Sequence, residues 1–411
     1  MQKSLQIFKA GLCLLLLLMV GGVELVHAGD GTAGSEVTIR TDATDPLQVF
    51  FLIGVNEIEK GNFAAAVDIF EALASQTESP RVKLELARTL FLDRRYRASR
   101  KIFNEVLGQP DVPWGVQENI RAYLEEIDAA LGFVKFGVSL VSDSNPLNFT
   151  DSQQIMIAGQ LLTVVRPAEV KEVYGVRFSV NAAKAIREDG SIIGYFNAYY
   201  SHFENSRFHR GVGDIGLLYS FKPLPKFKLR AGIEEAIYGG RHHYQFPYVG
   251  FIFIPFLTNQ FWVNNELKVG WLRVPEADQF NSTNVSLTTK INRQLFKRIL
   301  GSGDIYLEKS MADEDAYSYH GGSLGFGLSI PFLKHWSIKP HVSVGRRIYE
   351  GVDPFFADTR RDKIRRYAIT VKNFNIKAFG YSPEIGVSYE ESSSTLPFYS
   401  YDKVLLIFGF N

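Results

Sequence analysis

The chain has 411 residues, of which 22% are charged, and its formal net charge of +1 gives no reason to expect a nucleic-acid partner. Aromatic residues are abundant at 13%, and the one cysteine, Cys13, lies near the N-terminus, so a disulfide-rich secreted fold is excluded. Abundant glycine and aromatic residues indicate an extracellular β protein or a membrane barrel.

The N-terminus has the layout of a secretory signal peptide. Two lysines precede an apolar stretch from Leu12 to Val20, and Val26-His27-Ala28 resembles a cleavage site. The stretch is shorter than the roughly 20 residues of a spanning helix, which argues against the alternative of a single-pass anchor. We therefore predict a signal peptide over residues 1–28, followed by a flexible leader over residues 29–45 that is rich in Gly, Thr and Asp.

Residues 46–132 show apolar residues at three- and four-residue spacing, which predicts amphipathic helices. The pattern returns after 33 residues, close to the 34-residue period of tetratricopeptide helix pairs. Tight turns are expected at 61–63 and 94–96, and a last helix over 114–131 would cap the stack. An unrelated helical bundle is the alternative, because stable arrays usually have more repeats. The matched residues are Gly54, Phe63, Ala66, Phe70 and Leu73 in the first copy, and Ala87, Tyr96, Ser99, Phe103 and Val106 in the second.

Beyond the helices, apolar residues alternate with polar ones, which is the period of a β-strand. In the first example Val134, Phe136 and Val138 are separated by Lys135 and Gly137. A soluble sandwich with its apolar face inward is the alternative. The predicted strands are long, and a tilted strand needs about 9 to 11 residues to cross a membrane. Aromatic pairs near the strand ends are also typical of membrane barrels.

We predict fourteen strands, an even number, as single-chain bacterial barrels require. An even number brings both ends of the barrel sequence to one side, which places the helical domain in the periplasm and the barrel, residues 133–411, in the outer membrane. The predicted fold class is a short tetratricopeptide-like α-helical repeat domain followed by an antiparallel transmembrane β-barrel. The strands are expected at 133–142, 171–184, 191–203, 211–222, 226–238, 243–254, 260–273, 281–293, 303–311, 317–331, 335–347, 364–374, 380–391 and 398–410.

The connections between strands are expected to alternate in length. Compact turn signals lie on the periplasmic side, at 188–190, 223–225 and 332–334. The segment 296–303 is long for such a turn and fits the pattern poorly. The loop after the first strand contains an apolar stretch, 155–165, which would either fold into the lumen or extend a hairpin beyond the membrane.

No set of residues points to catalysis. His242 and His243 are adjacent, so on a strand they face opposite sides of the sheet and cannot easily hold one metal ion together. The sequence contains no phosphate-binding glycine loop ending in Lys-Ser or Lys-Thr. We therefore expect neither an enzyme nor a cofactor or metal site. The loop 353–363 mixes aromatic side chains with charge, which predicts either a binding surface or part of the barrel rim.

Three short motifs accompany this organisation: Asp-Ser-Asn-Pro at 143–146, Arg-Asp-Lys at 361–363, and the tail from Gly380 to Asp402. With the repeats and the barrel, they resemble the surface lipoprotein assembly modulator (Slam) family, whose members combine periplasmic helical repeats with an outer-membrane barrel. The first motif looks like the family's acidic-x-Asn turn, the second is similar to its Arg-x-Asp strand start, and the third looks like its final hairpin. The outer-loop candidates are therefore Asp143, Asn145, Arg361 and Asp362.

The resemblance implies a translocator that delivers specific lipoproteins or small secreted proteins to the cell surface. Its partners would be the client, outer-membrane lipids and the barrel assembly machinery, with no nucleic acid. By repeat position, Gln48, Arg81 and Arg88 are expected on the concave face of the helices, where a client would dock, although solvated surface positions are the simpler interpretation. The alternative functions are an exopolysaccharide-export barrel or a passive porin-like barrel with an accessory helical-repeat domain.

Overall fold

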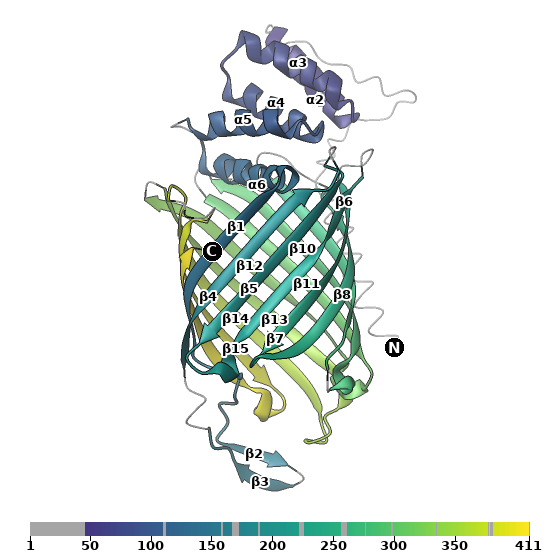
Figure 1. The fold of residues 1–411 in the computed structure, drawn as a ribbon, viewed down its shortest axis with the longest axis vertical. Coiled ribbons are helices and arrows are strands. Elements are labelled where there is room, and N and C mark those ends of the chain that lie inside the picture. Colours follow the sequence, from purple (N-terminus) through teal and green to yellow (C-terminus); the bar gives the residue numbers. More distant parts are fainter. Residues whose placement is uncertain are drawn as a thin grey trace, which may run out of the picture. The chain divides into compact units, whose positions relative to one another are not determined.

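The described part of the chain begins with helices and continues as a β-barrel (Figure 1). The predicted signal peptide and leader lie outside the described residues, and their predicted limits stay predictions. From Leu47 onward the chain forms one compact unit. The computed structural model describes residues 46–109, 112–157, 159–166, 172–187, 190–221, 226–255, 261–275, 277–296, 299–333, 335–376, 378 and 381–410.

Five helices precede the barrel in the described residues, as the apolar spacing predicts. They are α2 (Pro46–Glu59), α3 (Phe63–Gln76), α4 (Pro80–Leu92), α5 (Tyr96–Leu107) and α6 (Trp114–Leu131). Gly132 follows α6 with a φ of 98°, which a side chain would disfavour, and turns the chain directly into the first strand. Within the described residues, none of the helices combines the length and the apolar character needed to cross a membrane.

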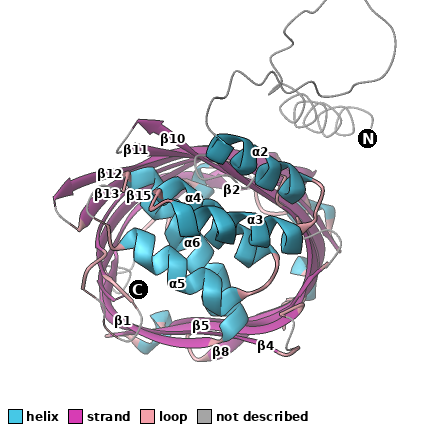
Figure 2. Cartoon of the chain, turned by 90° about the horizontal axis from the view of Figure 1, so that it is seen from above, coloured by secondary structure: helices cyan, strands magenta, loops and turns pink. Residues whose placement is uncertain are grey.

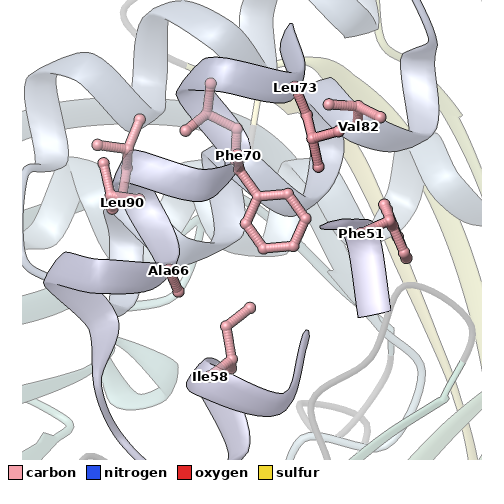
Figure 3. Packing of buried hydrophobic residues seen from close by; sticks show 9 residues of the cluster. Phe51, Ile58, Ala66, Phe70, Leu73, Val82 and Leu90 are labelled. Atoms are coloured by element: carbon pink, nitrogen blue, oxygen red, sulfur yellow. The ribbon is translucent and has the colours of Figure 1, made fainter. Parts of the chain in front are cut away.

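The two helix pairs, α2–α3 and α4–α5, pack alike at positions 33 residues apart. Gly54 of α2 lies against Phe70 of α3, because a Cβ atom at residue 54 would stand 2.8 Å from the ring Cζ atom. In the second pair the small residue is Ala87, whose carbonyl oxygen accepts a 2.7 Å hydrogen bond from Ser99 Oγ. Figure 3 shows the buried cluster that joins the first pair to α4 through Val82 and its neighbours. The internal repeat therefore corresponds to a repeated packing arrangement.

Fourteen strands form a closed antiparallel barrel, as predicted. They are β1 (Phe133–Asp143), β4 (Val173–Ala185), β5 (Ile192–Phe203), β6 (Arg210–Ser220), β7 (Phe227–Tyr238), β8 (Arg241–Phe253), β9 (Phe261–Leu272), β10 (Ser282–Phe296), β11 (Ile299–Ala312), β12 (Tyr319–Leu333), β13 (Trp336–Val352), β14 (Thr359–Asn373), β15 (Pro383–Ser394) and β16 (Tyr401–Phe410). Strands that follow one another in the barrel pair with one another, and β1 closes the ring by pairing with both β4 and β16.

Some strand limits differ from the predicted ones. The segment that fits poorly as a turn is mostly strand, because β10 continues to Phe296 and β11 already begins at Ile299. The last strand begins at Tyr401 and not at 398, because Pro397–Tyr399 forms a 3-10 helix in the preceding loop. These differences arise at strand ends, where loop residues interrupt the alternation on which the prediction rests.

The apolar stretch in the loop after β1 forms a two-stranded hairpin. Its strands are β2 (Gln154–Ile157) and β3 (Gln160–Thr163), which pair antiparallel. Figure 1 shows this hairpin beyond the end of the barrel that lies opposite the helices. Of the two placements considered for the stretch, the structure therefore shows the hairpin.

The outer face of the barrel is apolar and the inner face is polar. On β1, Val134 and Leu140 are 60% and 58% exposed, whereas Ser139 on the opposite face is 1% exposed. A wide band of exposed apolar side chains around a closed barrel is stable in contact with lipid. The strands have 10 to 17 residues, which is enough to cross a membrane. The chain therefore forms a transmembrane barrel of the outer-membrane type.

Candidate functional site

Helix α6 lies across the end of the barrel at which β1 begins, which we call the helix end (Figure 2). It contacts β4 and β5 on one side of this opening and β11 on the other. Gly115 near the start of α6 lies against Gln294 of β10, and Glu126 near its end forms a 2.5 Å ion pair with Lys228 of β7. Because its contacts reach strands on both sides, α6 obstructs the opening.

Aromatic and charged side chains hold the first half of α6 in place. The ring of Trp114 packs edge-on against Phe374, just after β14, with 5.3 Å between the ring centroids. The guanidinium of Arg121 lies 4.4 Å from the centroid of the Phe374 ring, and Lys339 of β13 lies 3.4 Å from Glu118. Contacts of these kinds contribute on the order of 0.5–2 kcal/mol each. Several modest contacts therefore hold α6 at the helix end.

Charged side chains of both signs line the lumen in close pairs. Arg347 Nη2 lies 2.8 Å from Glu308 Oε1, and a hydrogen bond of 2.8 Å joins the ring Nε2 of His341 and Asp304 Oδ1. These residues alternate along their strands with exposed apolar residues of the outer face, so they point inward. Paired charges make the lining polar without a strong preference for one sign of ion. Further pairs on the same face are Arg230–Glu266, Arg366–Glu390 and Lys372–Glu384.

The predicted outer-loop residue Asp143 lies at the other end of the barrel, which we call the far end. Its side chain is 1% exposed, and Oδ2 lies 3.0 Å from Nη1 of Arg210, the first residue of β6. Its Oδ1 accepts a 3.0 Å hydrogen bond from the backbone N–H of Asn145. Asp143 therefore links the end of β1 to a strand that is not its neighbour in the barrel.

The side chain of Asn145 closes the loop after β1. Its Nδ2 donates to the carbonyl oxygens of Phe149, at 2.9 Å, and Asp402, at 3.0 Å. Its Oδ1 accepts a 2.8 Å hydrogen bond from the backbone N–H of Phe149. These bonds hold the loop against the start of β16. The structure thus brings Asp143 and Asn145 together at the junction where the barrel closes.

An apolar cluster fills part of the far end beside this junction. Phe203 and Phe208 are buried there together with Val141 and Val173, and Ile407 of β16 packs against them. This contact explains why β16 is apolar on both faces. Its outward face meets lipid, whereas Ile407 faces an apolar cluster inside the barrel.

The second predicted pair, Arg361 and Asp362, separates in the structure. Asp362 is 2% exposed, and both of its carboxylate oxygens lie 3.0 Å from Nε of Arg360. The side chain of Arg361 is exposed, and its backbone N–H donates to Thr395 Oγ1 at 3.0 Å. The Arg-x-Asp unit formed by side chains is therefore 360–362. Arg360 is absent from the predicted site, although its spacing from Asp362 is the signal that identifies it.

Arg360 also joins strand β13 to the loop between β15 and β16 at the far end. Its guanidinium carbon lies 3.7 Å from the ring centroid of Tyr399 and 4.7 Å from that of Tyr349. Tyr399 donates a 2.7 Å hydrogen bond from its hydroxyl to Asp353 Oδ2. Burial and the bond to this carboxylate raise the pKa of Tyr399, so its phenol remains a donor at neutral pH.

Two neighbouring aromatic residues of the loop 353–363 differ in their surroundings, and a binding role for this loop stays a prediction. Phe356 packs against Phe398, with 5.7 Å between ring centroids, and so belongs to the rim. Its neighbour Phe355 is 65% exposed. The side chain of Phe356 therefore ties this loop to the one between β15 and β16.

The three candidate docking residues differ in exposure. Gln48 and Arg81 are exposed, and Arg81 lies 4.5 Å above the ring of Phe51. Arg88 is partly buried. Its Nη1 lies 3.0 Å from Oε2 of Glu85, one turn earlier on the same helix, and Tyr123 of α6 also interacts with it. Burial lowers the pKa of Arg88, but nearby Tyr123 and Glu85 raise it by more, so the guanidinium stays charged. Docking of a client on these side chains stays a prediction.

The adjacent histidines of β8 have aromatic neighbours. The ring of His243 lies 6.1 Å from that of Tyr238 and 5.8 Å from that of Tyr244. Across the ranges that the structure describes, no group of three or more His, Cys, Asp or Glu side chains could hold a metal ion. The described chemistry is therefore that of paired charges, aromatic rings and hydrogen bonds.

Comparison with protein families gives a match to the barrel. The family described as "Surface lipoprotein assembly modifier" matches residues 133–411, from the first residue of β1 onward. The resemblance found in the short motifs is thereby confirmed. No curated protein sequence matches the chain.

Solved outer-membrane proteins are similar to the chain at low identity. A loop-deletion mutant of OmpT, an outer membrane protein of Vibrio cholerae, is 7% identical, with a TM-score of 0.38 over 68% of this chain and 99% of that one. An anion-selective porin from Comamonas acidovorans is 9% identical, with a TM-score of 0.36 over 68% and 98%. A bacterial polysaccharide outer membrane secretin is also 9% identical, with a TM-score of 0.36 over 69% and 98%. Scores this low carry no argument about substrates.

Proposed function

The chain belongs to the surface lipoprotein assembly modifier family, and from this premise we propose that it delivers specific lipoproteins or small secreted proteins to the cell surface. The helices dock the client and the barrel provides the passage. One observation carries the proposal: the family match begins at Phe133, the first residue of β1, and so extends over the transmembrane barrel. A transmembrane barrel in a family that assembles surface lipoproteins supports a role in their transfer.

The orientation follows from where a client would start. A lipoprotein reaches the outer membrane from the periplasm, so the helix end faces the periplasm and the far end faces the exterior. The helices then meet the client before the barrel does. Because α6 obstructs the helix end, passage requires α6 to leave its contacts with Phe374 and Lys339.

The lining of the lumen supports the passage of a polypeptide. An extended chain presents backbone amides and side chains of both signs, and the paired charges of the wall offer donors and acceptors to both. The outer-membrane lipids and the barrel assembly machinery are the remaining partners in this proposal.

The deciding experiment is coexpression of the full chain with a candidate lipoprotein from the same cell. Protease added to intact cells is expected to digest the lipoprotein only when this chain is present. Equal digestion with and without the chain would remove the translocator function. A steady conductance of the purified barrel in planar bilayers, combined with unchanged exposure of every candidate client, would instead favour the porin-like alternative.

A further inference from the structure

Helices α2 and α4 are equivalent in the internal repeat, and no helix precedes α2 in the part of the chain that the structure describes. Residues of α4 correspond to residues of α2 that lie 33 positions earlier. One face of α4 packs on α5, through Leu84 and Ala87. The corresponding face of α2, with Phe51 and Gly54, packs on α3 in the same way.

The other face of α4 packs on the preceding helix. Val82, Leu86 and Leu90 of α4 join Phe70 and Leu73 of α3 in one buried cluster. This face of α4 is what connects the second helix pair to the first. It is therefore the interface by which the array grows from one pair to the next.

The corresponding face of α2 is exposed. Ile53, the equivalent of Leu86, is 39% exposed, whereas Leu86 is 6% exposed. Phe50 on the same turn is 54% exposed. Terminal repeats usually carry a polar outer face for solubility, so two large apolar side chains at this position need a reason.

We propose that this face of α2, formed by Val49, Phe50 and Ile53, docks an amphipathic helix of a partner protein. The equivalent face of α4 is already a helix–helix interface in the fold. The helix that occupies the same face of α4 is α3, so the occupant of the α2 face presents large apolar side chains at three- and four-residue spacing. This inference is separate from the proposed transport, because it needs only the helices.

The polar end of the face indicates an exchangeable partner. The equivalent of Leu90 in α2 is Glu57, whose carboxylate lies 2.9 Å from Lys60 Nζ and accepts a hydrogen bond from Asn62. Only the first half of the face is therefore apolar, and the contact area is smaller than between α3 and α4. The chain's own residues 29–45 are rich in Gly, Thr and Asp and lack the apolar spacing of a helix, so we assign the occupant to another protein.

The test uses a peptide with the sequence of α3, residues 63–76, as the probe. An isolated helix of this length is only marginally stable. A lactam link between Asp68 and a lysine in place of Ala72 therefore fixes the helix at two positions that are exposed in α3. Binding of the fluorescein-labelled peptide to the full chain in nanodiscs is measured by fluorescence anisotropy, and circular dichroism confirms the helix content of each variant.

We expect saturable binding that Ile53→Glu weakens at least tenfold. The matched control is Leu52→Glu, since residue 52 is exposed and its equivalent in α4 is Glu85, which lies outside the cluster with α3. The Leu52→Glu variant is expected to bind as the unmodified chain does. A peptide with Phe70→Glu is expected not to bind.

Three results would overturn the inference. An equal loss of peptide binding in the Leu52→Glu and Ile53→Glu variants would show that the peptide adsorbs to any apolar surface. Sedimentation that shows a dimer of the chain, lost in Ile53→Glu, would identify a second copy as the occupant. Tenfold tighter peptide binding after deletion of residues 29–45 would identify the chain's own leader as the occupant.

Discussion

Gly61 and Arg94 lie in equivalent turns, 33 residues apart, and both have a left-handed backbone, with φ of 81° and 63°. Glycine adopts this conformation freely, whereas a residue with a side chain loses roughly 1–2 kcal/mol. Arg94 Nη2 donates a 3.2 Å hydrogen bond to the carbonyl oxygen of Ser220, at the end of β6. The second turn therefore carries a link to the barrel, at the cost of a strained backbone.

Gly61 and Gly108, which both follow a helix, are expected to differ in their response to alanine. Gly61→Ala should destabilise the α2–α3 pair by about 1 kcal/mol, because the strain is in the backbone and no atom lies near the added methyl group. The control is Gly108→Ala, since Gly108 has a φ of −76° and ordinary contact distances around a Cβ atom. Hydrogen exchange of α3 amides measures the difference, and equal exchange in the two variants would contradict it.

Loss of the Asp143 carboxylate should weaken the closure of the barrel. Asp143→Asn leaves Arg210 without its buried partner, which costs on the order of 2–5 kcal/mol. The measurement is the temperature at which the folded, faster-migrating band disappears on a gel. The double variant Asp143→Asn with Arg210→Gln should recover part of the loss, and a purely additive loss would show that the pair is not coupled.

The helical region should lose stability in alkaline solution because of Tyr123. Burial raises the pKa of Tyr123 from 10.0 to about 12. Below pH 10 the phenol is protonated in the folded and the unfolded state. Between pH 10 and 12 it ionises only in the unfolded state, so the folded state loses roughly 2–3 kcal/mol of stability in total. Circular dichroism at 222 nm, with denaturant, should show this loss between pH 9.5 and about 12. The variant Tyr123→Phe should not show this loss of stability. An equal loss in the variant and the unmodified chain would refute the role of Tyr123.

A covalent link between α6 and the barrel should stop delivery. A Cβ atom at residue 115 would lie 2.8 Å from Cγ of Gln294, which places the pair Gly115→Cys and Gln294→Cys within reach of a disulfide. The single cysteine, Cys13, lies in the predicted signal peptide, so the mature protein would carry only the engineered pair. When the engineered cysteines are oxidised to a disulfide, exposure of the client at the cell surface should fall to the background level. It should return when a reductant opens the disulfide.

The control for this link is Ile215→Cys with Ile233→Cys, a directly opposed pair on the outer face of β6 and β7. It adds a disulfide without touching α6 and should leave delivery unchanged. Full delivery with the α6 disulfide in place would mean that the client does not pass α6.

The shift of the Arg-x-Asp unit is tested by two neighbouring arginines. Arg360→Ala should destabilise the far end by about 2–4 kcal/mol, because buried Asp362 loses its paired guanidinium. Arg361→Ala should change stability by less than about 0.5 kcal/mol, since its side chain is exposed. Thermal unfolding on gels and protease sensitivity of the loop 353–358 report both variants, and equal effects would argue against the assignment of Arg360.

Local spacing is enough to predict most of the fold. Alternate residues of a strand in a membrane barrel face lipid and the lumen, whichever strands lie beside it. The outward position of Val134 and the inward position of Lys135 can therefore be predicted from the sequence. The repeat positions Gly54 and Ala87 are likewise readable, because small residues are required wherever two helices approach closely. The prediction fails at 296–303, where the strand ends lack clear alternation.

The order of helices and strands, the number of strands and the face that most strand residues present can be predicted locally, because these depend on neighbours within a few positions. Contacts between residues far apart in the chain depend on how the whole barrel folds. Asp143 forms an ion pair with Arg210 because the barrel closes, and Trp114 packs on Phe374 because α6 crosses the end of the barrel. Such pairs depend on the curvature and register of all fourteen strands together, and no local pattern of residues encodes them.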